Sequence, residues 1–188
     1  AAAGANELAW AFGGGSDLEV GESLNLPNER LAELARAAGL DPAEAPSVNL
    51  FESFYAEVNP TSGEATERQL IPEAQAFAIT ALTQRARHIG PESTPEERYY
   101  VLLGFEEAVA LASTLRTRMI GDEGTFAPLN LEPEEGEDAL GQSTDIGQFA
   151  VLEAFSRLTI LAETLDDTTA FGTELKTIVN RAPYRQFA

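Results

Sequence analysis

Residues 94–121 read TPEERYYVLLGFEEAVALASTLRTRMIG and carry the strongest helix signal in the chain. Thr94 stands where a helix cap is expected, Pro95 takes the first helical position, and Glu97 completes a capping box. Beyond this start, apolar residues recur at helical spacing up to Gly121, namely Val101, Leu102, Phe105, Val109, Ala112 and Met119. The stretch therefore predicts a long helix with one apolar side, ending at the glycine.

The segments on either side of this stretch also show helical spacing. A helix is expected from Pro72 to the Gly90-Pro91 stop, another over residues 144–165, and a third after a cap at Asp167. Two short helices are predicted nearer the N-terminus, one from Pro27 to Gly39 and one over residues 48–58. Together with residues 94–121, the three later segments give four longer helices.

Alternation with a period of two is not sustained anywhere, and at most residues 18–26 could hold a strand. The sequence thus predicts an all-α fold. We expect an antiparallel bundle of four longer helices with short N-terminal helices and an extended N-terminal arm. The arm comprises residues 1–25, and residues 26–188 form a single helical domain with an acidic crossover loop at 121–145.

Composition excludes several classes of protein. A chain of 188 residues that is 44% hydrophobic can bury one core without cross-links. It has no cysteine, so disulfides, thiolate nucleophiles and cysteine-bound metals are excluded. The net charge is -19 and no basic stripe is present, which disfavours a nucleic-acid partner. No apolar run approaches the ~20 residues that a membrane helix needs.

Catalytic signatures are also missing from the sequence. His88 is the single histidine, so the Glu-x-x-His pairs of di-iron bundles cannot be formed. It follows Arg85 and Arg87 at the end of a predicted helix, where cations are favoured by the helix dipole. No nucleophile elbow or phosphate-binding loop is present. We therefore predict that the protein is not an enzyme and that it carries no cofactor, with calcium as an open alternative.

The acidic loop at 121–145 contains eight carboxylates and no basic residue. It lacks the EF-hand spacing, but a calcium site of another kind remains open. Its candidate ligands are Asp122, Glu123, Glu134, Glu135, Glu137 and Asp138, with Glu132 as a further possible ligand. The loop also contains Phe126, Leu129 and Leu131, which a merely solvated tether would not need. Acidic charge with spaced apolar anchors is typical of a segment that docks on a basic partner.

The N-terminal arm carries Trp10 and Phe12 in a glycine-interrupted segment. Burying a large side chain of this kind is worth roughly 1.5–3 kcal/mol, so we expect these rings to be covered by the protein's own domain or by a partner. Residues 1–6 read AAAGAN, as after cleavage at a small-residue site. This favours an extracytoplasmic protein, periplasmic or secreted, with a processed N-terminus.

The predicted helix at 144–165 has two apolar faces. The first contains Val151, Phe155, Leu158, Ala162 and Leu165, and the second contains Ile146, Phe149 and Ile160. Glu153 and Arg157, four residues apart, fall within the second face. If this helix is central, the two form a partly dehydrated ion pair, which is either structural or part of a ligand-binding pocket with Arg116.

These observations favour a binding function. The leading hypothesis is a non-catalytic helical accessory or structural subunit that docks on a larger protein assembly through Trp10, Phe12, Phe126, Leu129 and Leu131. The partner is another protein or a second copy of the chain. The alternative is a helical-bundle binding protein for a small ligand, held by Arg116, Glu153 and Arg157, or for calcium.

Overall fold

The computed structural model describes residues 20–58, 65–90 and 92–182, and the helix predicted from residues 94–121 lies at its centre. Helix α4 runs from Pro95 to Arg118. Thr94 Oγ1 accepts a hydrogen bond from the Glu97 N–H at 3.1 Å, and Glu97 Oε2 accepts one from the Thr94 N–H at 2.7 Å. The predicted capping box is thereby confirmed. Buried side chains occur on all sides of α4, as expected for an enclosed helix.

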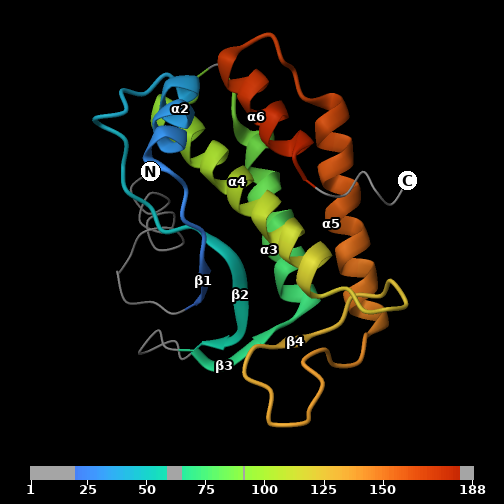
Figure 1. Cartoon of the computed structure of the whole chain (residues 1–188). Coiled ribbons are helices and arrows are strands. Elements are labelled where there is room, and N and C mark those ends of the chain that lie inside the picture. The colour runs from blue at the N-terminus through green and yellow to red at the C-terminus, as the bar shows by residue number, and fades with distance from the viewer. Residues whose placement is uncertain (1–19, 59–64, 91, 183–188) are drawn as a thin grey trace.

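Four other α-helices are described, namely α2 (Asn28–Ala38), α3 (Pro72–Gln84), α5 (Asp145–Thr164) and α6 (Ala170–Asn180). Helices α2, α3 and α6 pack on α4, whereas α5 packs on α3 and α6 and lies at one edge of the molecule (Figure 1). A short 3-10 turn, η1 (Arg85–His88), extends α3. The four longer predicted helices are thus present as α3 to α6, and the predicted start of α3 at Pro72 is confirmed.

The all-α prediction is wrong, because an antiparallel sheet lies beside the helices (Figure 1). Its strands are β1 (Gly21–Ser23), β2 (Phe51–Val58), β3 (Ala65–Leu70) and β4 (Leu129–Asn130), and they pair in the order β1-β2-β3-β4. Gly21 pairs with Phe54, and Gln69 pairs with Asn130. The fold is therefore mixed α and β, with the helical core on one side of the sheet.

Strand β2 occupies the segment for which a short helix was predicted. Its apolar residues satisfy a helical spacing, but Phe51 and Ser53 are buried in alternation, and aromatic residues suit a strand. Two long-range contacts favour the extended form. The Phe54 N–H donates to Gln75 Oε1 at 2.9 Å and Gln75 Nε2 donates to the Phe54 carbonyl at 2.7 Å, while Thr114 Oγ1 donates to the Glu52 carbonyl at 2.8 Å.

The acidic loop is more ordered than a tether. It supplies β4, and its backbone returns twice onto itself, with Gly121 N–H donating to the Thr125 carbonyl and Asn130 N–H donating to the Ala139 carbonyl, each at 2.8 Å. Gly124 has φ 78°, a left-handed conformation that favours glycine at this turn. The loop therefore links α4 to α5, as predicted, and also closes one edge of the sheet.

Candidate functional site

The outer side of α5 carries most of the exposed large apolar side chains among the described residues. We define the α5 outer face as Ile146, Phe149, Glu153, Arg157 and Ile160. Ile146, Phe149 and Ile160 are 70%, 72% and 56% exposed. Leu152 on α5 and Phe77 on α3, the helix that packs beside α5, are also exposed. Scattered exposed apolar residues are ordinary, whereas several on one side of one helix are a feature that is common at interaction surfaces.

This exposure follows from the two apolar faces seen in the sequence and from the position of α5. The first face points inward, and its members Val151, Phe155, Leu158 and Ala162 are buried. Because α5 covers the bundle at one edge, its opposite side has no described element against it (Figure 1). The second apolar face is therefore present as predicted, and it points to solvent.

Helices α3 and α5 run parallel and share this surface. At their starts, Thr144 caps α5 by accepting from the Gly147 N–H at 3.0 Å, and it donates to Glu73 Oε1 at 2.7 Å. Toward their other ends, Gln84 and Leu161 line the same groove of about 210 Å³, together with Arg157 and Ile160. The exposed Phe77 lies between these two points along α3. The surface formed by α3 and α5 thus contains the exposed Phe77 side chain and a groove.

Glu153 and Arg157 form the predicted ion pair, with Arg157 Nη2 donating to Glu153 Oε1 at 2.7 Å. Their side chains are 59% and 28% exposed, so the pair is not dehydrated in the single chain. Arg116 lies on α4, and α5 packs on α3 and α6 rather than on α4. The structure therefore does not bring Arg116 together with this pair, and the three do not form the predicted ligand pocket.

Two apolar residues of the acidic loop belong to the core. Phe126 is 4% exposed and meets Phe155 edge to face with ring centres 5.9 Å apart, and Leu129 is 9% exposed. The Phe126 backbone is fixed by Gln148, which accepts from its N–H at 3.0 Å and donates to its carbonyl at 2.6 Å. Leu131 is half-buried. Phe126 and Leu129, predicted as docking anchors, instead attach the loop to its own domain, whereas Leu131 stays partly exposed.

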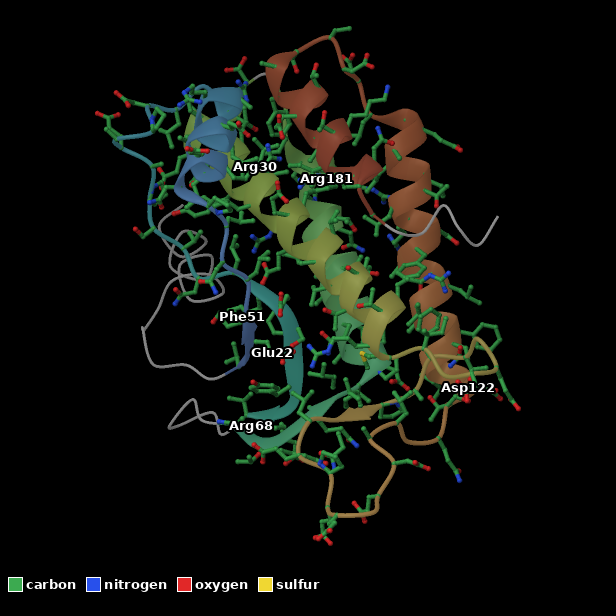
Figure 2. All side chains as sticks on the ribbon, in the orientation of Figure 1. Glu22, Arg30, Phe51, Arg68, Asp122 and Arg181 are labelled. Atoms are coloured by element: carbon green, nitrogen blue, oxygen red, sulfur yellow. The ribbon has the colours of Figure 1, made fainter. Side chains whose placement is uncertain are left out.

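The acidic side chains of the loop point outward. Asp122, Glu123, Glu134, Glu135, Glu137 and Asp138 are all exposed. Asp122 lies at the far end of α4, on the outside of the molecule (Figure 2). Within residues 20–58, 65–90 and 92–182, no group of three or more histidine, aspartate or glutamate side chains is placed to hold a metal ion. The predicted calcium ligands therefore do not gather in such a group among the described residues, and calcium binding stays a prediction. Trp10 and Phe12, the remaining predicted anchors, lie outside the described residues.

A buried charge cluster on α4 was missed by the sequence analysis. Glu106 is 4% exposed and accepts from Arg30 Nε at 2.7 Å and from Arg181 Nη2 at 2.6 Å. Arg30 also donates to Glu174 Oε1 at 2.5 Å. Burial alone would lower the pKa of Arg30, but its hydrogen bonds to Glu106 and Glu174 outweigh burial and raise that pKa. Figure 2 shows Arg30 on α2 and Arg181 after α6 on the same side of α4. The cluster therefore joins three helices.

Glu107, the next residue, is 1% exposed and faces β2. Its Oε1 accepts from the Phe51 N–H at 3.0 Å, while its Oε2 has no hydrogen-bond partner among the residues described. Burial raises the pKa of Glu107 to about 7, against the opposing effects of the Phe51 N–H and the positive charge of Arg85. The sequence signal that was available for the Glu106 cluster and for the buried Glu107 is a pair of adjacent acids inside an apolar helix.

A wider groove of about 590 Å³ lies between α2, η1, the start of α4 and α6. Its lining includes the apolar side chains of Ile89, Phe171 and Leu175, with Arg36 and Arg98 as its cationic members. The volume is within the range of small-molecule sites. Arg36 is exposed, so the cationic side of this groove is open to water.

Comparisons with known proteins add no functional assignment. No protein-family model matches the chain, and neither curated proteins nor solved structures gave a significant match. Within the described part of the chain, no helix combines the length and apolar character needed to cross a membrane.

Proposed function

We propose that this protein is a non-catalytic subunit that associates with a protein surface through the α5 outer face. The observation that carries the proposal is the exposure of Phe149 and Ile146 at 72% and 70%, on a helix whose opposite face is fully packed. Leaving such side chains in water forgoes roughly 1.5–3 kcal/mol each relative to burial. A partner that covers them recovers part of this free energy.

The α5 outer face has the composition of an interface centre. It combines aromatic and aliphatic side chains with one arginine, and aromatic residues and arginine are enriched in such centres. It holds one acid and one base, so it is locally neutral in a chain of net charge -19. A protein partner can therefore approach this face with less electrostatic opposition than at the acidic loop.

The test uses the full chain as bait in extract of its source, with Phe149→Asp and a matched control, Thr177→Asp, on the exposed side of α6. The proposal expects a species retained in stoichiometric amount by the wild type and by Thr177→Asp, and lost with Phe149→Asp. That species is either another protein or an untagged second copy. Retention that is unchanged by Phe149→Asp would assign the binding to another surface and reject this one.

A second candidate function is small-ligand binding at the groove between α2 and α6. It is favoured by the apolar residues in the groove's lining and by the exposed Arg36, which suits the head group of an amphipathic carboxylic acid, while Asp166 in the same lining opposes an anion. A ligand that binds the folded state raises the melting temperature, and the rise grows with the ratio of free ligand concentration to the dissociation constant. Decanoate is a suitable probe, and a melting temperature that decanoate leaves unchanged at saturating concentrations would count against this candidate.

A further inference from the structure

We propose that the occupant of the α5 outer face is a second copy of this chain, paired by a two-fold axis that is perpendicular to α5 and passes beside it, midway between the levels of Glu153 and Arg157. This inference rests on the proposed function and specifies its partner. In such a pair the two α5 helices run antiparallel, and residue numbers that face each other add up to about 310. The α5 outer face is self-complementary if the residues paired by this rule attract each other.

The two charged residues of the face, Glu153 and Arg157, are paired by this rule. Glu153 of one copy faces Arg157 of the other, and the reverse contact is made by symmetry. Because Glu153 and Arg157 already pair within each helix at 2.7 Å, the dimer has a ring of four alternating charges. Each carboxylate then lies between two guanidinium groups, and no charge at the centre of the interface lacks an opposite neighbour.

The apolar residues satisfy the same rule. Phe149 meets Ile160 of the other copy on one side of the axis, and Ala150 meets Leu161 on the other. The exposed side chains at 72% and 56% are thereby placed against each other. Ile146 of each copy lies opposite Thr164 of the other copy, once at each end of the interface. Every large exposed apolar residue on the α5 outer face thus obtains a contact from one rotation.

Helix α3 extends the match. A two-fold axis perpendicular to α5 leaves α3 on the same side of both copies and reverses its direction. Phe77, four residues after Glu73 at the start of α3, then faces the other end of the partner's α3 and α5. That end holds the groove of about 210 Å³, which is lined by the apolar Ile160 and Leu161 together with Thr83, Gln84, Arg87, Arg157 and Thr164. The exposed ring and the groove are complementary under the operation that pairs the charges.

The acidic loop favours this antiparallel arrangement over a parallel one. The loop at 121–145 leads into the start of α5 and carries eight carboxylates. In a parallel pair the two loops would lie side by side, whereas the antiparallel pair separates them by about the length of α5, roughly 30 Å for 20 residues. That distance exceeds the screening length of about 8 Å at physiological salt, so the loops hardly repel each other.

The test is the oligomeric state of the full chain, measured by sedimentation velocity over a range of protein concentrations at low and high salt. We expect a dimer that tightens with salt, because salt screens the repulsion between two chains of charge -19. Glu153→Arg and Arg157→Glu, each alone, place like charges across the axis and are expected to weaken the dimer by about tenfold or more. Glu29→Arg, the same charge change as Glu153→Arg but on the exposed start of α2, is the matched control for that variant and leaves the dimer unchanged.

The decisive measurement mixes the two variants. Glu153→Arg presents only arginines at the centre and Arg157→Glu presents only glutamates, so an equimolar mixture restores both cross-pairs and forms a heterodimer. Circular dichroism of each variant shows whether it remains folded. A wild type that stays monomeric, or a mixture that stays as monomeric as its components, overturns the pairing. If the wild type is monomeric yet Phe149→Asp abolishes binding to a different protein, this inference fails while the proposed function stands.

Discussion

Helix α4 buries Glu106 and Glu107 at 4% and 1% exposure, whereas α5 exposes Ile146 and Phe149 at 70% and 72%. The two helices thus place charged and apolar side chains in the opposite of their usual surroundings. In α4 the carboxylates are retained inside by guanidinium and backbone donors from α2, β2 and the end of α6. In α5 nothing described covers the apolar side. The difference teaches that a helix at the centre must satisfy its polar groups internally, while a helix at the edge can hold apolar groups for a partner.

The largest effect is expected from two phenylalanines that lie on opposite sides of α5. Phe126 packs on Phe155 at the inner side, so Phe126→Ala leaves a cavity and should lower the free energy of unfolding by about 3–5 kcal/mol. Phe149→Ala, on the outer side, should change it by less than about 0.5 kcal/mol in dilute, monomeric protein. Urea unfolding of both variants measures the difference. Equal losses would mean that the outer face is packed in solution.

The buried charge cluster is expected to give the next largest effect. Glu106→Gln leaves the guanidinium groups of Arg30 and Arg181 without their shared carboxylate and should cost about 3 kcal/mol. Glu33→Gln also removes a partner of Arg30, but Glu33 is 57% exposed, so the loss should be below about 0.5 kcal/mol. The same urea measurement applies. A small loss for Glu106→Gln would show that water reaches the cluster.

Glu107 should make stability depend on pH near neutrality. Because its pKa is about 7 when folded and 4.5 ordinarily, the folded protein retains a proton that the unfolded chain releases. Its contribution to the free energy of unfolding is therefore fully present below pH 4.5 and is lost as pH rises through about 7. The loss is at most about 3 kcal/mol.

Unfolding by urea at pH 5 and pH 8 measures this dependence. Glu107→Gln should remove most of the decrease in the free energy of unfolding between pH 5 and pH 8, since the amide does not ionise. Glu67→Gln, an exposed carboxylate on β3, serves as the control and should leave the fall intact. If Glu107→Gln keeps the wild-type pH dependence of the free energy of unfolding, another ionisable group causes that dependence.

The smallest effect is expected from the exposed ion pair on α5. Glu153→Gln removes an i,i+4 pair of 59% and 28% exposed side chains, so the monomer should lose about 0.3–0.5 kcal/mol. The measurement is made at low protein concentration, where only the intrahelical pair counts. At high concentration the loss should grow if the proposed dimer forms, which separates the contribution of the second copy from that of the helix.

Sequence patterns predicted the elements whose signals are local. The cap at Thr94, the proline start at Pro72 and the glycine end of α2 at Gly39, with φ 84°, are short-range features and all are present. The two faces of α5 were also predicted, because periodicity depends only on the helix itself. The direction in which each face points depends on the neighbours of α5, which spacing along one helix does not encode.

The missed elements depend on distant residues. Strand β2 has apolar positions that fit either period, and its extended form is selected by Gln75 and by pairing with β1 and β3. Strand β3 reads ATERQL, with little apolar pattern of its own. Phe126 was interpreted as a partner anchor because its covering residue, Phe155, is 29 positions away in the chain, and no local signal reveals that contact.

The bond between Arg181 and Glu106 also sets an order of events during synthesis. The two residues are 75 positions apart, so at about 5–20 residues per second a ribosome takes about 4–15 s to add the second after the first. During that interval Arg30, which is made earlier, is the guanidinium available to Glu106. The nascent chain can therefore assemble α2 against α4 before α6 exists, and Arg181 adds a second guanidinium group to Glu106 once it has been made.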